Sequence, residues 1–326
     1  MPRKEVVAHI LEKRRSELLS KPNVVGYSNV IQKRIRRGRV VDEPVIRVYV
    51  KKKLPRNLLR PQDLVPEEVE GIRTDVVEIG EVEAWALLQP RAAASPLYTG
   101  RYRPVIAGVS IGHYQITAGT LGWYVKAPNA EILFASNAHV FTPNASGQEG
   151  QYEGDPILQP GPYDGGRNPD DKVAEYVWHK RVVPEGEGGI NHIDFAVARP
   201  VVDYLVRNYH GTQPVHAIGL LFAGSSSITV VCKCKHIYNE GYRFIDFTGA
   251  EMKCVDPLDD EVTLSATKEG RTTGYHGNII TDESAAVRVN YGGFTAYFED
   301  VIFFRNPFGQ PGDSGSFVFI PDASFD

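Results

Sequence analysis

The part of the chain that follows residue 105 consists of short apolar runs, broken by glycine, proline and asparagine at intervals of about ten residues. Runs of this length that are rich in β-branched and aromatic residues are typical of strands, and their even spacing is typical of β-sandwiches and β-barrels. We expect strands over 117–124, 132–136, 172–178, 195–198, 217–222, 228–231, 287–291, 295–298 and 317–320, and at most a short turn of helix over 201–208. The sequence therefore predicts a mainly β body in which long helices are scarce.

The N-terminal part has a different pattern. It is predicted to form a helix over 4–20, strands over 24–30, 44–50 and 72–80, and a positively charged hairpin tip over 33–39. We interpret residues 1–80 as a small, basic α+β module and residues 81–104, which include an Ala-Ala-Ala-Ser-Pro stretch, as a linker to the β body at 105–326.

Length and composition narrow the class of protein. The 326 residues suffice for one large domain, and fractions of 42% apolar and 23% charged residues are those of an ordinary globular protein. No run approaches the ~18 apolar residues of a membrane span, and the charged start, Met1 to Glu5, lacks the apolar core of a signal peptide. We therefore expect no membrane partner and a cytoplasmic location.

Cysteines are few and odd in number: Cys232, Cys234 and Cys254. Cys232 and Cys234 alternate along a strand-like run, and a metal site would need further ligands of this kind nearby. We expect reduced, buried thiols, which favours an intracellular protein. The acids of the turn-rich loop 161–171 could bind a cation, but turn formation alone explains them, so neither a metal ion nor another cofactor is predicted.

Charge is distributed unevenly. Residues 1–60 hold 17 Lys and Arg against 5 Asp and Glu, whereas the remaining residues hold 19 against 35. This asymmetry suggests an acidic partner for the N-terminal part. We favour docking on the protein's own acidic body or on a neighbouring subunit of a homo-oligomer or larger assembly, because no aromatic residues interleave the basic cluster. Nucleic-acid binding through Arg34, Arg36 and Arg37 is the less favoured alternative.

A glycine-rich turn near the end of the chain carries a candidate nucleophile, Ser314. The turn reads Gly309-Gln310-Pro311-Gly312-Asp313-Ser314-Gly315-Ser316, and the apolar run 317–320 follows at once. A reactive serine needs a tight turn with free backbone N–H groups, and glycine permits both. An ordinary polar turn that enters a strand would have a similar composition.

Two upstream residues could complete a catalytic triad. His139 follows the apolar run 133–135 in a corner of small polar residues, and Asp194 stands at the head of another buried strand. The chain order His, Asp, Ser is the order of chymotrypsin-type serine peptidases. Imidazole, with an ordinary pKa of about 6.5, is suited to remove the proton of a serine near neutral pH.

The chain resembles trypsin-like serine peptidases and, more narrowly, the bacterial and plant group that includes the plant Narrow leaf 1 proteins. The resemblance covers about 70–326. Besides the three triad positions it is carried by the segments 108–114, 117–122, 155–161 and 270–274.

This resemblance implies a chymotrypsin-like pair of six-stranded antiparallel β-barrels, one over about 105–200 and one over about 201–326. It also implies a serine endopeptidase that cleaves protein or peptide substrates through an acyl-enzyme. His139 would act as the base, Asp194 would hold its tautomer, and the N–H groups of Gly312 and Ser314 would form the oxyanion hole. Without the resemblance, Asp194 could equally be a carboxylate that caps a loop.

One departure from the family pattern concerns the segment 217–225, which reads Ala-Ile-Gly-Leu-Leu-Phe-Ala-Gly-Ser. It resembles a hairpin that follows the serine in that group, whereas here the chain stops at Asp326. Either the hairpin is transposed within the barrel or the sequence lacks its native end. We expect 217–231 to lie beside 317–320, with Phe222, Ala223 and Gly224 facing the substrate cleft; the alternative is a strand deep in the barrel wall, far from the serine. The competing interpretation of the whole chain is a catalytically idle scaffold or binding protein that acts through its basic module.

Overall fold

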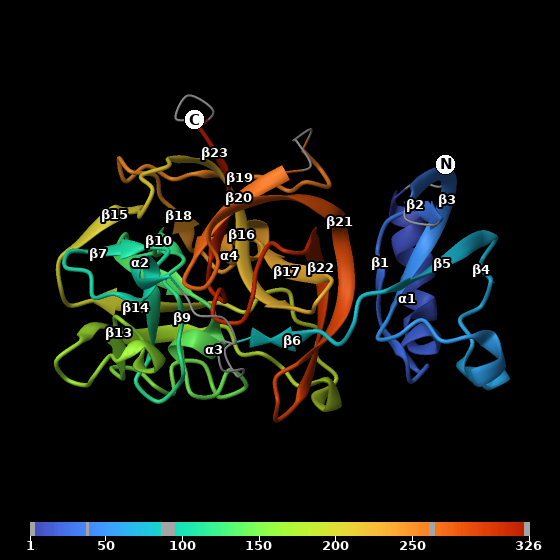
Figure 1. Ribbon diagram of the computed structural model, residues 1–326, viewed down its shortest axis with the longest axis horizontal. Helices are drawn as coiled ribbons and strands as arrows, with labels where there is room; N and C mark the ends of the chain where they lie inside the picture. Colours follow the sequence, from blue (N-terminus) through green and yellow to red (C-terminus); the bar gives the residue numbers. More distant parts are fainter. Residues whose placement is uncertain (1–3, 37–38, 86–94, 261–264, 323–326) are drawn as a thin grey trace.

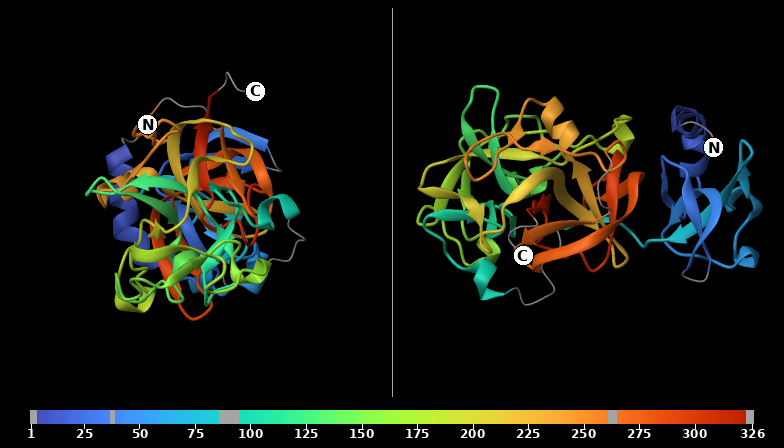
Figure 2. Two further views of the ribbon diagram at one scale, coloured as in Figure 1. Left: turned by 90° about the vertical axis from the view of Figure 1, so that its left-hand side faces the viewer. Right: turned by 90° about the horizontal axis from the view of Figure 1, so that it is seen from above.

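The computed structural model describes residues 4–36, 39–85, 95–260 and 265–322. Figure 1 shows two β-rich lobes that pack against each other and a smaller N-terminal lobe beside them. The right-hand view of Figure 2 shows the same arrangement from above, with the N-terminal lobe joined to one end of the body. The prediction of a mainly β protein is confirmed.

The second lobe is a six-stranded antiparallel barrel. Its strands are β16 (Pro214–Gly224), β17 (Ile228–Lys233), β20 (Ser265–Gly270), β21 (Gly274–Asn290), β22 (Thr295–Arg305) and β23 (Phe317–Pro321). They follow the order β20-β23-β16-β17-β22-β21, and β21 pairs again with β20, so the sheet closes on itself. Every one of the six strands contributes to one buried apolar cluster, which includes Leu221, Val231 and Val318. This cluster fills the barrel.

The displaced hairpin belongs to this barrel. Strand β16 pairs with β23 in the register Leu220 to Phe317, and β17 pairs with β22. The prediction that 217–231 lies beside 317–320 is therefore confirmed.

The first lobe is a single curved sheet. Its strands are β8 (Ser110–His113), β9 (Gly119–Thr120), β10 (Trp123–Lys126), β11 (Ile132–Ser136), β12 (Pro156–Leu158), β13 (Lys172–His179), β14 (Ala196–Pro200) and β18 (Arg243–Phe244). The order is β18-β10-β11-β14-β13-β12-β8-β9. Strand β9 stands at one edge of this sheet, and β10 lies next to the strand at the other edge. Because only two residues separate β9 from β10 in the chain, the two edges of the sheet lie close together. Val125, Phe134 and Val197 are fully buried in its core.

The turn of helix expected over 201–208 is wrong. Tyr204–Asn208 forms strand β15, which pairs in parallel with β7 (Val105–Ala107). Its side chains alternate in burial, as a strand requires. Tyr204 stacks on Tyr124 with ring centroids 5.4 Å apart, and this tertiary contact favours the strand.

The N-terminal lobe combines a helix with a small sheet. It contains α1 (Lys4–Leu19), β1 (Val24–Ser28), β2 (Gln32–Arg36), β3 (Arg39–Val50), the 3-10 turns Arg56–Leu58 and Pro61–Asp63, β4 (Glu68–Val69) and β5 (Ile72–Glu78). The helix buries Leu11 and Leu18 against Ile46 and Val48 of β3. The tip of the β2–β3 hairpin, residues 37–38, lies outside the described part of the chain.

The sheet of the N-terminal lobe continues into the barrel of the second lobe. Strand β1 pairs with β21 in the register Gly26 to Val287. At Gly26 a Cβ would lie 2.1 Å from the carbonyl oxygen of Ala286, so only glycine permits this approach. On the same strand β21, the buried carboxylate of Asp282 accepts a hydrogen bond from the Tyr49 hydroxyl of β3.

Asp282 predicts a pH dependence of stability. Burial raises its pKa from 3.8 to about 6, even though hydrogen bonds from Tyr49 and Ser284 act to lower it. Between about pH 4 and pH 6 the native state therefore holds a proton that the unfolded chain has lost, so the free energy of unfolding falls as the pH rises. Asparagine does not ionise. Asp282→Asn should melt at a higher temperature than the wild type above pH 6, and at a similar temperature below pH 4.

Calorimetry at both pH values measures this difference. Asp42→Asn is the control, because the Asp42 side chain is 88% exposed. If Asp282→Asn lowered the melting temperature above pH 6, the carboxylate would be a net stabiliser and the expectation would be wrong.

Shorter elements complete the fold. They are β6 (Glu83–Ala84), α2 (Pro96–Thr99), α3 (Ala138–Phe141), the 3-10 turns Pro162–Asp164 and Glu185–Glu187, α4 (Cys234–Asn239) and β19 (Lys253–Cys254). Among the described residues, no helix is long and apolar enough to cross a membrane.

The prediction of three reduced thiols is wrong for two of them. Cys234 and Cys254 form a disulfide, and only Cys232 is a free, buried thiol. Strand β17 ends at Lys233 and α4 begins at Cys234, so Cys234 leaves the strand that carries Cys232. Strand β19 pairs with β16 and places Cys254 beside Ala217, and Sγ of Cys234 lies 3.1 Å from the carbonyl oxygen of the same Ala217. The cysteines therefore give no support to the expected cytoplasmic location.

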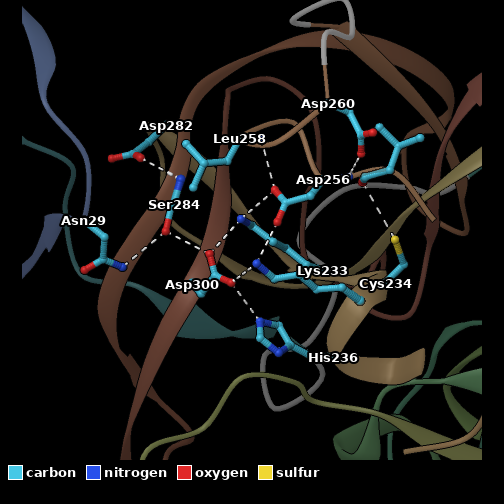
Figure 3. A network of polar contacts seen from close by, with 12 residues as sticks. Asn29, Lys233, Cys234, His236, Asp256, Leu258, Asp260, Asp282, Ser284 and Asp300 are labelled. Carbon is cyan, nitrogen blue, oxygen red and sulfur yellow. Dashed lines mark hydrogen bonds and ion pairs between the residues drawn. The ribbon is translucent and has the colours of Figure 1, made fainter. Parts of the chain in front are cut away.

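A network of charged side chains lies next to Cys234, where β17 ends and α4 begins (Figure 3). The ammonium of Lys233, only 1% exposed, lies 2.8 Å from Asp256 and 2.7 Å from Asp300. His236 and Ser284 bond the same Asp300 carboxylate, at 2.9 and 2.8 Å. Burial acts to raise the pKa of Asp300, but the hydrogen bond from His236 and the charge of Lys233 bring it well below its usual range. The network ties α4 to β21 and β22.

Candidate active site

His139 lies in the short helix α3, directly after strand β11 of the first lobe. The corner between them is fixed by Asn137, whose side-chain amide donates to the backbone carbonyl of Asp194 at 2.7 Å. The Nδ1 atom of His139 bonds the Asp194 carboxylate. Since Nδ1 faces a carboxylate, it carries the proton, and Nε2 is left as the basic nitrogen.

Asp194 is fully buried at the start of β14, which pairs with β11. Its carboxylate also accepts from the backbone N–H of Ala138 at 2.6 Å and from the Tyr291 hydroxyl at 2.7 Å. Burial raises the pKa of Asp194, but the charge of His139 and these hydrogen bonds outweigh burial and lower the pKa below its ordinary value. Asp194 is thus held as a carboxylate that orients the imidazole of His139.

Ser314 lies in the turn between β22 and β23 of the second lobe. Gly312 and Gly315 adopt φ values of +97° and +95°, which residues with a side chain rarely adopt. A Cβ on Gly315 would also lie 2.1 Å from Oγ of Ser136 in the first lobe. The Ser314 carbonyl accepts from the N–H of Thr120 at 2.8 Å. The serine turn therefore sits directly on the first lobe, the lobe that carries His139.

Ser314, the candidate nucleophile, and His139, the candidate base, each have a buried polar atom without a hydrogen-bond partner in the described structure. Ser314 is fully buried and His139 is 4% exposed, and both Oγ of Ser314 and Nε2 of His139 are buried without a hydrogen-bond partner in the described structure. Buried polar atoms are nearly always paired, and exceptions are concentrated at functional sites. These two unpaired atoms belong to the two groups that must exchange a proton in a serine hydrolase.

Asp313, next to the serine, anchors the turn to a buried lysine. Its carboxylate accepts from the N–H groups of Thr272 and Thr273 at 2.8 and 3.1 Å, and from the N–H of Gln310 at 3.0 Å. The Lys268 ammonium lies 3.2 Å away, and both side chains are fully buried. Burial lowers the pKa of Lys268, while the charge of Asp313 opposes that effect. The sequence did not indicate a role for Lys268, because nothing in the local pattern of its strand shows that it pairs with Asp313.

The loop 161–171, a cation-site candidate in the sequence, has another role. The Arg271 side chain forms a two-armed ion pair with Asp164, and Ser110 donates to the same carboxylate at 2.5 Å. The Arg271 backbone N–H bonds Oγ1 of Thr120 at 3.0 Å. Asp164 is thus a structural partner of the segment that holds Asp313. Among the described residues, no group of three or more His, Cys, Asp or Glu side chains could bind a metal ion.

The expected substrate edge runs beside the serine turn. Leu221 of β16 accepts from the N–H of Gly315 at 2.8 Å and donates to the carbonyl of Ser316 at 3.0 Å. The Phe222 side chain is buried and packs on Phe298, with centroids 4.6 Å apart, so it does not face a cleft. Ala223 and Gly224 pair with β6, and the Ala223 side chain is fully buried, so this edge of β16 is covered by the chain itself.

Two cavities flank the site. One of about 540 Å³ adjoins His139 and is lined by Thr142, Asn144, Tyr291 and Phe294, among others. The other, of about 480 Å³, is lined by Gly224, Gly309, Pro311 and Trp85, among others.

His139 and Asp194 belong to the first lobe, and the Ser314 turn of the second lobe lies against that lobe. Comparisons with known proteins identify proteins of similar sequence or structure. The chain is 26% identical over 311 residues to Protein NARROW LEAF 1 of Oryza sativa subsp. japonica. The match includes 88% of this chain and 47% of that protein, so the chain spans about half the length of this curated relative.

The chain is also similar to the crystal structure of Nocardiopsis Protease (NAPase), with a TM-score of 0.33 and 13% sequence identity over 67% of this chain and 80% of that chain. No protein-family model matches the chain.

Proposed function

We propose that the chain is a serine endopeptidase, with His139, Asp194 and Ser314 as its catalytic residues. The observation that carries the proposal is the His139–Asp194 bond, because it leaves the basic Nε2 of His139 buried and unpaired, and Oγ of Ser314 is likewise buried and unpaired. A carboxylate that merely capped a loop would not need to orient an imidazole in this way.

The reaction follows from this arrangement. Nε2 of His139 takes the proton of Ser314 as Oγ attacks the carbonyl carbon of the peptide bond. The N–H groups of Gly312 and Ser314 stabilise the oxyanion, an effect worth roughly 3–4 kcal/mol for one such donor. His139 then gives its proton to the leaving amine, and a water molecule attacks the acyl-enzyme in the same way to release the acid and restore Ser314.

A fluorophosphonate probe tests this proposal, because it labels a serine only when the hydroxyl is activated. We expect one label per chain, on the peptide that contains Ser314, with no label in Ser314→Ala and greatly slowed labelling in His139→Ala. Absence of label from the correctly folded wild type would remove the peptidase proposal and leave the scaffold interpretation.

The basic module supports a docking role better than nucleic-acid binding. Arg34 lies 2.7 Å and Arg36 lies 3.5 Å from the Glu43 carboxylate, so part of their charge is neutralised within the module. Arg37 lies outside the described residues. Arg15 of α1 contacts the body, 3.3 Å from Glu299 of β22. We propose that the positive charge of the module serves attachment to acidic surfaces, beginning with its own body.

A further inference from the structure

Beyond its pairing with β23, strand β16 has an edge to which a substrate strand could add. Another part of the same chain occupies that edge. Strand β6 pairs with it in antiparallel register, Ala84 with Ala223 and Glu83 with Gly224. On the other side of β6, the N–H of Asn290 donates to the carbonyl of Val82 at 2.9 Å. In Figure 1, β6 lies where the chain passes from the N-terminal lobe into the body, beside the second barrel.

Strand β6 runs along β16 towards the serine turn. Since the pairing is antiparallel, the chain moves from Gly224 towards Phe222 as it runs from Glu83 to Trp85. Trp85 follows β6 directly, and Ala223, the partner of Ala84, is two residues from Leu221, which is hydrogen-bonded to both residues after Ser314. Addition of a strand to an exposed edge is a general way to hold an extended peptide.

The indole of Trp85 fills a recess made by two glycines. Trp85 is 3% exposed. Its Cζ2 lies 2.2 Å from the place of a Cβ on Gly224, and its Cζ3 lies 2.9 Å from that of a Cβ on Gly309. Gly309 belongs to the turn that carries Ser314, and Phe308 and Leu221 share an apolar cluster with the indole. The absence of side chains at 224 and 309 is therefore what creates room for a large flat ring beside the serine turn.

We propose that β6, with Trp85 directly after it, occupies the substrate-binding edge of the active site as a peptide would, and that the enzyme cleaves peptides that carry a large aromatic residue on the acyl side of the cut bond. This inference rests on the proposed peptidase function. The recess is apolar where the indole lies, so lysine, arginine or aspartate would bury a charge without a partner there. As part of the same chain, the strand competes at an effective concentration on the millimolar scale or above, and the apparent affinity for free peptides is reduced accordingly.

The test compares Trp85→Gly with the conservative variant Trp85→Phe. Fluorogenic peptides of the form acetyl-Glu-Ala-X-aminocoumarin, with X as Trp, Phe, Lys or Asp, serve as substrates. We expect at least about a tenfold rise of kcat/KM for X = Trp and Phe in Trp85→Gly, mainly through KM, and little rise in Trp85→Phe. Peptides with Lys or Asp should remain poor substrates of every variant. A cut after Trp85 in the wild type that is absent from Ser314→Ala would also support the inference.

Two further measurements keep the inference testable if Trp85→Gly folds poorly. Gly224→Val places a side chain where the indole lies, so it should abolish cleavage of aromatic peptides while Ser314 still reacts with a small fluorophosphonate. Acetyl-Glu-Ala-Trp-amide should inhibit the wild type competitively, whereas the Lys analogue should not.

If the fluorophosphonate labels Ser314 but charged peptides are cleaved as well as aromatic ones, or Trp85→Gly leaves KM unchanged, the inference is wrong and the peptidase proposal stands. If no variant is labelled, the peptidase proposal itself fails.

Discussion

Ser314→Ala and His139→Ala should each lower kcat for peptide hydrolysis by at least about a thousandfold, and the double variant should be hardly worse than either. The reason is that the two side chains act in one step: without the base the hydroxyl stays protonated, and without the hydroxyl the base has nothing to activate. The remaining rate comes from binding and from the N–H groups of the serine turn. Initial rates with an aromatic fluorogenic peptide measure these effects.

Asn144→Ala is a matched control, since Asn144 lines the cavity beside His139 and takes no part in proton transfer. Its kcat should stay within a few-fold of the wild type. Retention of more than about a tenth of the rate in Ser314→Ala would show that another group is the nucleophile, and additive losses in the double variant would show that the pair does not act as a unit.

Lys268→Met should both destabilise the protein and inactivate it. It removes the cation 3.2 Å from the buried Asp313 carboxylate, and loss of one partner of a buried ion pair typically costs about 3–5 kcal/mol. Asp313 still accepts the N–H groups of Thr272 and Thr273, but its buried charge is no longer compensated, so the serine turn and the proposed oxyanion donors are expected to shift. We expect a large fall of the melting temperature and a fall of kcat at saturating peptide.

The double variant Lys268→Met, Asp313→Asn separates these two effects. It removes both charges, so stability should partly recover while kcat stays low, because the turn still lacks its anchor. Lys253→Met is the control, since Lys253 makes an exposed pair with Asp260 that is expected to contribute little. If Lys268→Met left both the melting temperature and kcat near the wild-type values, the pair would not support the turn.

Most strands could be predicted from the sequence, because a strand has a local pattern of alternating residues. Alternation and flanking glycines located β11, β13, β17 and β23 to within a few residues. Strand β21 was underestimated: 287–291 was expected, whereas Gly274–Asn290 forms, because its first half carries polar side chains on an exposed face. Strand β6 has only two residues and exists through its pairing with β16, so no periodicity could indicate it.

Only part of the candidate site could be predicted from the sequence, because only some of its residues stand in a local pattern. His139, Asp194 and Ser314 stand in local patterns that a family resemblance can match. Their supporting residues do not: Tyr291 bonds Asp194 from 97 positions away, and Lys268 reaches Asp313 from another strand. The Cys234–Cys254 disulfide was missed because the strand that carries Cys232 ends one residue before Cys234.

The acyl-enzyme itself is the most direct test of the central claim, that Ser314 is a nucleophile activated by His139 and Asp194. The wild type is mixed with the p-nitrophenyl ester of acetyl-tryptophan, quenched in acid within seconds, and analysed by intact mass and peptide mapping. The proposed mechanism predicts one acetyl-tryptophanyl group per chain, attached to Ser314, and none in His139→Ala under the same conditions. Release of nitrophenol without any adduct on Ser314, or an equal adduct in His139→Ala, would contradict it.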